Sequence, residues 1–271
     1  MFEVIFLFVL GLIWVVFAVV QDLRSREISN WLNFSLVIFA LGFRFFYSLF
    51  NESFGFFFQG LIGFGIFFVL GNLMYYGRFF AGGDAKLMMS LGAILPIYNL
   101  FSVNLKFFLL FFILFLVAGS VYGLSSILYI GIKNHKLFVK GFSEKFSKHK
   151  KLLIAITFAS CVFLTLGFIE KFYLYIGLFI FVSTYLFICS KVIDANCMVR
   201  KIPVKYLREG DWICNNILIS KNKKIISSWD GLSQKDIKLL RKNKKFVLIK
   251  QGIPFSPVFL IAYVILFIWI I

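Results

Sequence analysis

Long apolar stretches, separated by short polar breaks, make up most of the chain. A helix needs roughly 20 apolar residues to cross a lipid bilayer. Stretches close to this length lie at residues 3–20, 31–50, 55–77, 84–100, 106–131, 152–169, 172–190 and 254–271. The pattern therefore predicts an α-helical polytopic membrane protein with about eight transmembrane helices.

The polar segment 191–253 predicts a folded unit outside the bilayer. Its short β-type runs predict strands, and a capping-box sequence predicts a helix start. The expected elements are strands at 217–219 and 225–226 around the turn Lys221-Asn222-Lys223-Lys224, a helix at 233–243 starting at Ser233-x-x-Asp236, and a strand at 246–249. Together they make a small α+β domain, marginal in size for independent stability.

Composition supports the membrane assignment. Hydrophobic residues make up 61% of the chain and charged residues only 15%, a balance that excludes a soluble globular domain. The first apolar stretch has no basic segment before it and no small-residue cleavage site after it, so we expect a retained helix rather than a signal peptide. The four cysteines form no C-x-x-C pair, which argues against a zinc site or a disulfide framework.

The distribution of basic residues predicts the orientation. Of 29 Lys and Arg residues, seven lie within 133–151 and 15 within 191–250. The positive-inside rule places both segments in the cytoplasm and the N-terminus outside. Topology and attraction to anionic membrane lipids explain the net charge of +17 without nucleic-acid binding. The basic residues that fall toward the outside lie near span ends, where long side chains can snorkel: Arg44, Lys106 and Lys171.

Two aspartates lie where a carboxylate is costly. Asp22 ends the first apolar stretch, and Asp84 lies between two later ones. Ionisable groups at membrane depth are rare and usually functional. The predicted topology places both aspartates at the cytoplasmic face, where two carboxylates from separate helices can share one proton. Aspartic proteases use this arrangement, in which one carboxylate activates water and the other polarises the scissile carbonyl, with no cofactor.

The residues around Asp84 support a reactive site. Gly82 and Gly83 allow the backbone to approach a substrate closely. A helix start at this point, with Lys86 nearby, favours an ionised Asp84. Asp22 lies at the C-terminal end of its helix, where the dipole disfavours negative charge. We therefore expect Asp84 to be the base and Asp22 to be protonated more readily.

These residues resemble the type IV prepilin peptidase family, and most closely its archaeal preflagellin and prepilin peptidases. The family's first aspartate lies in a stretch like Asp22-Leu23-Arg24-Ser25-Arg26-Glu27-Ile28-Ser29-Asn30, and its second in a G-x-G-D motif like Ala81-Gly82-Gly83-Asp84. Ala81 replaces the first glycine, and Ser29 replaces a proline often found before the asparagine. The tail is also similar, in Asp230-Gly231-Leu232-Ser233 and Gly252-Ile253-Pro254-Phe255-Ser256-Pro257.

The resemblance implies an aspartic endopeptidase with Asp22 and Asp84 as catalytic residues and Arg24, Asn30, Gly82, Gly83 and Lys86 as supporting residues. It implies removal of class III signal peptides from prepilins or preflagellins at the cytoplasmic face of the cell membrane. It also implies a six-span core, to which an extra hairpin is added. The expected parts are a transmembrane catalytic core at 1–131, a basic cytoplasmic loop at 132–151, a transmembrane hairpin at 152–190, a basic cytoplasmic domain at 191–253 and a C-terminal transmembrane helix at 254–271.

Three alternatives stay open. An intramembrane aspartic protease of the presenilin or signal-peptide-peptidase type also uses a G-x-G-D site, but both of its aspartates lie within later spans. A non-proteolytic transporter coupled to protons or cations would use the aspartates as carriers, although the sequence shows no internal repeat or paired broken helices. A membrane scaffold with a basic docking domain would not depend on either aspartate.

Overall fold

The computed structural model describes residues 2–220, 223–228 and 231–270. The chain forms two compact units, one made of Met1–Gly123 with Pro254–Ile271 and the other of Leu124–Ile253. Three residues of the predicted motifs lie outside the described residues: Lys221, Asn222 and Asp230.

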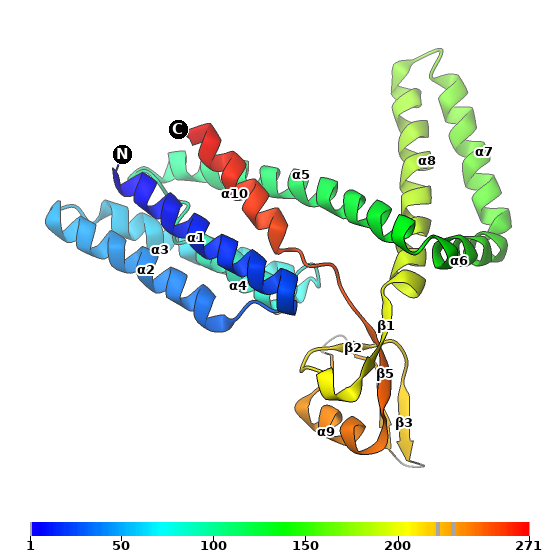
Figure 1. Ribbon diagram of the computed structural model, residues 1–271. Coiled ribbons are helices and arrows are strands. Elements are labelled where there is room, and N and C mark those ends of the chain that lie inside the picture. The colour runs from blue at the N-terminus through cyan, green and yellow to red at the C-terminus, as the bar shows by residue number, and fades with distance from the viewer. Residues whose placement is uncertain (1, 221–222, 229–230, 271) are drawn as a thin grey trace. The chain divides into compact units, whose positions relative to one another are not determined.

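The first unit is a bundle of helices (Figure 1). Its helices are α1 (Phe2–Ser25), α2 (Asn30–Phe50), α3 (Gly55–Tyr76), α4 (Gly82–Leu91), the first part of α5 (Phe101–Lys133) and α10 (Ser256–Ile270). The C-terminal α10 packs against the N-terminal α1, and α4 packs against both α2 and α3. A continuous apolar core runs through the bundle and includes Leu36, Met88, Phe111 and Phe259, all fully or almost fully buried. The first and last helices of the bundle, α1 and α10, therefore pack in the same apolar core.

Glycines bring α3 and α4 into close contact. A Cβ atom added at Gly63 would lie 2.4 Å from the Gly92 carbonyl oxygen and 2.4 Å from Pro96 Cγ. Gly60 leaves room for the side chain of Arg44 in the same way. Small residues permit close helix packing in membrane proteins, where dispersion contacts rather than hydrophobic expulsion hold helices together.

The prediction of a continuous helix over 84–100 is wrong beyond Leu91. Helix α4 ends there with Gly92 as its C-cap, and the chain continues without regular helix to α5. Pro96 lacks a backbone N–H and so cannot continue a helical hydrogen-bond ladder. The carbonyl groups freed by this ending need donors, because unpaired buried backbone groups are costly.

Arg44 supplies those donors, which corrects its predicted snorkelling position. Its side chain is 0% exposed. Nε donates to the Ala93 oxygen at 2.8 Å, Nη1 to the Phe56 oxygen at 3.0 Å, and Nη2 to the Ile94 oxygen at 3.0 Å and to the Pro96 oxygen. The guanidinium also lies 4.3 Å from the centre of the Phe56 ring. Arg44 therefore holds the non-helical chain after α4 against α2 and α3.

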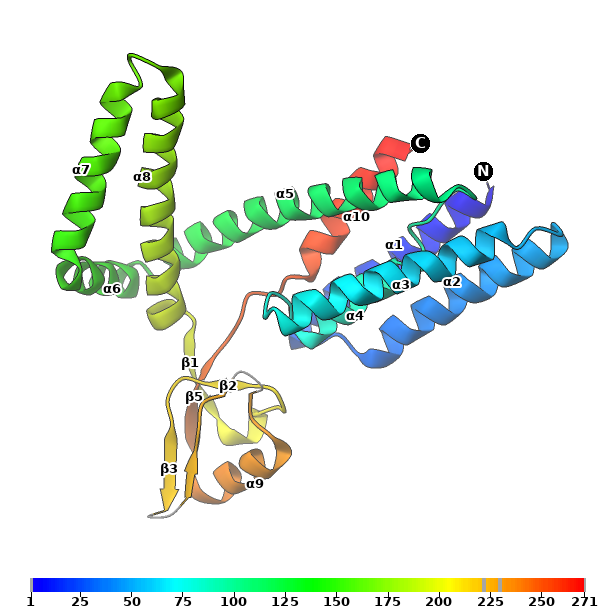
Figure 2. The same ribbon diagram turned by 180° about the vertical axis from the view of Figure 1, so that it is seen from behind.

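The second unit contains a helical part and a sheet part (Figure 2). Its helices are the end of α5, α6 (His135–Lys148), α7 (Lys150–Leu166), α8 (Lys171–Val192), the π-helix Ile193–Cys197, the 3₁₀-helix Val204–Tyr206 and α9 (Gln234–Asn243). Helices α7 and α8 pack side by side, which confirms the predicted helical hairpin. The basic segment 132–151, predicted as a loop, contains the amphipathic helix α6, whose axis makes an angle of 87° with α7.

The sheet part contains the predicted helix and strands and adds two strands, but Lys223 and Lys224, predicted in a turn, lie in a strand, and Ile226, predicted in a strand, lies outside it. Strand β5 (Phe246–Lys250) lies between β1 (Val199–Pro203) and β2 (Trp212–Ile213), and β3 (Ile217–Ser220) pairs with β4 (Lys223–Ile225), all antiparallel. Ser233 and Asp236 form the predicted capping box of α9. Alternate β5 residues Val247 and Ile249 are buried in a small core with Leu240. Strands β1 and β2 were missed because their sequences are short and partly polar.

Among the described residues, five helices are long and apolar enough to cross a membrane, or six if the bent pair α6 and α7 counts as one span. The five are α1, α2, α3, α5 and the helical stretch Lys171–Cys197 that contains α8. Helix α10 is apolar but shorter, and α4, with 10 residues, lies outside these candidate spans. The helices indicate a multi-pass membrane protein. Judged by helix length and composition, the described residues contain fewer candidate spans than the eight predicted.

Candidate active site

Asp22 extends the buried face of α1. Residues Gly11, Val15 and Ala18 precede it on this face at helical spacing, and all are buried. Asp22 is 7% exposed. Its Oδ2 accepts a hydrogen bond from the backbone N–H of Ser256, the first residue of α10, at 3.1 Å. The carboxyl group of Asp22 therefore lies at the end of the buried face of α1 and contacts the start of α10.

Asp84 lies in the first turn of α4. The preceding residues Gly82 and Gly83 form the helix start, and Ala81 is its N-cap. Asp84 is 8% exposed, and Leu87, Met88 and Leu91 continue the same buried face toward the core. The packing of α4 against α2 and α3 thus buries this carboxyl group together with an otherwise apolar surface.

The two carboxyl groups act on each other electrostatically. Burial raises the pKa of Asp84 to about 7, and the negative charge of Asp22 contributes to the same rise, while a backbone hydrogen bond at Ala81 acts in the opposite direction. A nearby negative charge disfavours the ionisation of a buried carboxyl group. The structure therefore brings together the two aspartates that the sequence singled out.

The direction of the Asp84 pKa argues against the predicted ionised state of Asp84. Helix-dipole reasoning favoured an ionised Asp84, but burial outweighs the dipole and raises the pKa of Asp84. Asp22 ends one helix, and its Oδ2 also accepts the backbone N–H at the start of α10. The raised pKa favours the protonated form of Asp84 up to about pH 7.

The two glycines before Asp84 differ in their surroundings. A Cβ atom at Gly83 would lie 3.2 Å from Ile28 Cβ, whereas the nearest atom at Gly82 is Tyr75 Cε2 at 3.8 Å. Gly83 thus lets the α4 start approach the turn between α1 and α2, and Gly82 has more room. The close neighbour of Gly83 is Ile28 of the protein itself, whereas the predicted approach to a substrate stays a prediction.

Lys86 joins α4 to α2. Its Nζ donates to Asn30 Oδ1 at 2.6 Å, so these two predicted supporting residues contact each other. The causes of the Asp84 pKa shift do not include Lys86. The remaining supporting residue, Arg24, is exposed in the last turn of α1.

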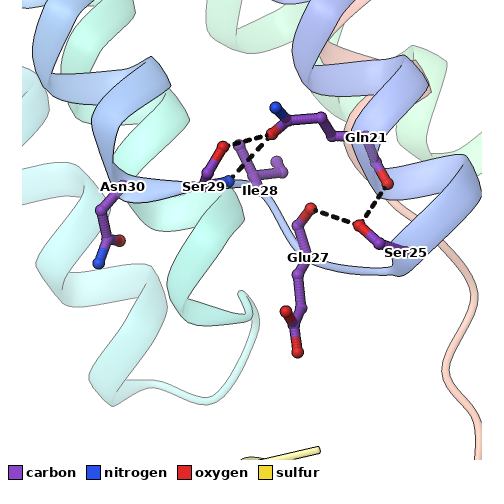
Figure 3. A pocket seen from close by; sticks show the side chains of 6 residues that line it. All are labelled: Gln21, Ser25, Glu27, Ile28, Ser29 and Asn30. Atoms are coloured by element: carbon purple, nitrogen blue, oxygen red, sulfur yellow. Dashed lines mark hydrogen bonds between the residues drawn. The ribbon is translucent and has the colours of Figure 1, made fainter.

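A polar cavity of about 480 Å³ lies at the turn between α1 and α2 (Figure 3). Its lining residues are Gln21, Ser25, Glu27, Ile28, Ser29 and Asn30. Gln21 Oε1 accepts hydrogen bonds from the Ser29 hydroxyl at 2.7 Å and the Ser29 backbone N–H at 3.1 Å. These hydrogen bonds hold the turn that follows Asp22. Gln21, the residue directly before Asp22, lines the cavity.

Sequence reasoning missed Ser256, Gln21 and Ser29 as parts of this site. Gln21 lies in no motif, and Ser29 lies in the stretch 22–30 that resembles the family's first motif, but the pairing of the two side chains depends on the path of the turn. Ser256 belongs to the tail motif Gly252-Ile253-Pro254-Phe255-Ser256-Pro257, whose resemblance to archaeal peptidases was a signal that this segment has a role.

Comparison with known proteins confirms the predicted resemblance. Residues 9–124, which contain both aspartates, match the type IV leader peptidase family. The preflagellin peptidase of Methanocaldococcus jannaschii is 38% identical over 93 residues, which cover 34% of this chain and 39% of that protein. The preflagellin peptidase of Methanococcus maripaludis is 31% identical over 93 residues, 34% of this chain and 40% of that protein. The preflagellin peptidase of Methanococcus voltae is 31% identical over 91 residues, with shares of 34% and 39%.

The chain thus aligns with about two fifths of the length of these curated relatives. No solved structure matches it significantly. The second unit, Leu124–Ile253, lies almost wholly outside the matched family segment.

Proposed function

We propose that this chain is a membrane aspartic endopeptidase that removes the short class III signal peptide of prepilins or preflagellins. The observation that carries the proposal is the pair of buried carboxyl groups, Asp22 and Asp84: burial, together with the charge of Asp22, raises the pKa of Asp84. The match of residues 9–124 to the type IV leader peptidase family supports the same chemistry.

The reaction follows from the charge states of the pair. Asp22 is the base that takes a proton from water, and the hydroxide formed attacks the carbonyl carbon of the scissile peptide bond. Protonated Asp84 donates a hydrogen bond to the carbonyl oxygen, which stabilises the negative charge that develops there. Asp84 then protonates the leaving amine as the carbon–nitrogen bond breaks, and Asp22 carries the proton taken from water. Proton exchange with solvent restores the pair, and no cofactor takes part.

Location at the cytoplasmic face of the cell membrane completes the proposal. The basic residues concentrated in 133–151 and 191–250 support an internal position for both segments, with the N-terminus outside. This orientation puts the C-terminal end of α1 and the start of α4 at the internal face, and both aspartates with them. Exposed lysines of α6 and its half-buried Phe138, Phe142 and Phe146 support contact with membrane lipids.

Cleavage of a defined substrate tests the function. Purified protein in lipid vesicles is incubated with a preflagellin, a prepilin and, as a control, a secretory protein with an ordinary signal peptide, and the products are identified by mass spectrometry. We expect cleavage after the leader of at least one class III substrate and none of the control. Cleavage of the ordinary signal peptide alone favours the presenilin or signal-peptide-peptidase type. No cleavage, together with proton or cation flux that depends on Asp22 and Asp84, contradicts the peptidase and supports the transporter.

A further inference from the structure

The last helix of the chain begins in direct contact with the proposed dyad. Ser256 is the first residue of α10, and its backbone N–H donates to Asp22 Oδ2 at 3.1 Å in a buried environment. The first N–H groups of a helix have no partner within the helix and are free to bind other acceptors. Residues 9–124 match the type IV leader peptidase family, so this contact comes from outside the matched segment.

Aromatic packing holds the start of α10 against the segment that carries Asp84. The centre of the Phe255 ring lies 6.0 Å from the centre of the Phe80 ring, and the centre of the Phe259 ring lies 5.9 Å from the same point. Phe80 directly precedes Ala81, the N-cap of the helix that bears Asp84. The Tyr122 hydroxyl donates to the Pro254 oxygen at 2.9 Å and fixes the chain just before α10. The start of α10 is therefore tied to both halves of the dyad.

The hydroxyl of Ser256 is buried without a hydrogen-bond partner. The residue is 0% exposed, and Oγ has no partner among the described residues. A buried hydroxyl left unpaired costs free energy, and such groups usually bind an ordered water or a ligand. Because only Cα and Cβ separate this oxygen from the nitrogen that contacts Asp22, it lies in the immediate surroundings of that carboxylate.

We propose that Ser256 is a positioning residue of the dyad, whose N–H orients the Asp22 carboxylate and whose hydroxyl holds the water that Asp22 deprotonates. This inference rests on the proposed peptidase function for the identity of the reacting water. The N–H contact with Asp22 stands without it. The water would be held between Ser256 Oγ and the Asp22 carboxylate, on the side of α1 that faces α10.

Single substitutions separate the two contacts. Ser256→Ala deletes the hydroxyl and keeps the N–H, Ser256→Thr keeps both, and Ser256→Pro deletes the N–H at a first helical position, where proline is well tolerated. Ser48 offers a matched control, because it is also 0% exposed with an unpartnered Oγ but lies near the opposite end of α2. Thermal unfolding of each variant in detergent checks the fold.

Turnover tests the hydroxyl. We expect Ser256→Ala to lower kcat on the order of tenfold with an unchanged KM, because the water loses its orientation while the leader still binds. Ser256→Thr should restore most of this loss, and Ser48→Ala should leave kcat unchanged. An unpartnered hydroxyl with no role predicts a silent Ser256→Ala. That outcome, or an equal loss in Ser48→Ala, overturns the proposal for the hydroxyl.

A chemical readout tests the N–H contact without turnover. Carbodiimides react with protonated carboxyl groups, and mass spectrometry reports the modification of Asp22 by itself. We expect Ser256→Pro to raise the modification rate of Asp22 several-fold, because the carboxyl group loses the backbone N–H that binds Oδ2. Ser48→Ala should match wild type. Equal rates in Ser256→Pro and wild type overturn the contact. If wild type cleaves no substrate, the peptidase function fails, and this readout still decides the position of Ser256.

Discussion

The charge of Asp22, at the end of α1, contributes to raising the pKa of Asp84, at the start of α4, to about 7. Burial is the larger cause of the rise. An isolated surface aspartate has a pKa near its ordinary value and is ionised in the neutral range. The raised pKa favours a protonated Asp84 at pH values at which most aspartates are ionised, and several measurable consequences follow from it and from the packing around it.

The pH dependence of cleavage should reflect the proton on Asp84. A carboxyl group with a raised pKa is neutral below that pKa and ionised above it, so the active form of the pair is lost as the pH rises through about 7. We expect kcat/KM to fall about tenfold for each further pH unit on the alkaline side. A profile that is flat from about pH 6 to about pH 9 would contradict the assignment of Asp84 as the acid.

Asp22→Asn should lower the pKa of Asp84. The substitution removes the negative charge that contributes to the rise and leaves the burial in place, so the pKa should fall but stay above its ordinary value. Titration of Asp84 by carbon-13 NMR, with selectively labelled aspartate, measures this shift. An unchanged titration curve in Asp22→Asn would mean that the two carboxyl groups do not interact.

Gly83 and Gly82 should respond differently to the same substitution. A Cβ atom at Gly83 would lie 3.2 Å from Ile28 Cβ and would push the start of α4 away from the turn after Asp22, whereas Gly82 has its nearest neighbour at 3.8 Å. We expect Gly83→Ala to lower kcat about tenfold or more through misplacement of Asp84. Gly82→Ala should change it less than about twofold. Equal losses in the cleavage assay would argue against a positional role of Gly83.

Gly63→Ala should destabilise the bundle, and Gly65→Ala on the same helix should not. A Cβ atom at Gly63 would meet the Gly92 oxygen and Pro96 Cγ, both at 2.4 Å, and nothing lies within 4 Å of one at Gly65. Overpacking of this kind costs about 1–3 kcal/mol, whereas alanine in place of an unconstrained helical glycine gains roughly 0.5–1 kcal/mol. Thermal unfolding in detergent compares the two, and the order of their midpoints is the test.

Arg44→Met should loosen the chain after α4. The substitution keeps a long side chain but leaves the carbonyls of Phe56, Ala93, Ile94 and Pro96 without their donor. Each buried group left unpaired costs about 1–3 kcal/mol, so we expect the free energy of unfolding to fall by about 2 kcal/mol or more. Lys106→Met changes an exposed basic residue of α5 and serves as the control. Similar unfolding curves for the two variants would refute a structural role of the buried guanidinium.

The sequence predicted most of the helices and both aspartates because these depend on local patterns. Apolar length marks a helix at membrane depth, and a carboxylate beside such a stretch is conspicuous. The capping box at Ser233 and Asp236 and the strand with alternate buried Val247 and Ile249 are local in the same sense. The end of the helix predicted at 84–100 does not follow from local sequence. Helix α4 ends at Leu91, and Arg44 from another helix binds the carbonyl groups that follow.

The charge states in the site were not accessible from local sequence. The position of Asp84 at a helix start, which is local, suggested an ionised carboxylate. The burial of Asp84 by α2 and α3 and the contact of Asp22 with Ser256 depend on tertiary packing, which local sequence does not show. Ser256 follows Asp22 by more than two hundred residues, and no periodic pattern links the two. Residues that act through such long-range contacts become visible only when the bundle is assembled.

The rates of four proteins test the central claim most directly: wild type, Asp22→Asn, Asp84→Asn and the double variant, each with the same class III substrate. If the aspartates act as one unit, each single substitution abolishes nearly all cleavage, by about 10³-fold or more, and the double variant is no slower than either single one. All variants should unfold at temperatures close to that of wild type. Substantial cleavage by either single variant would contradict the dyad.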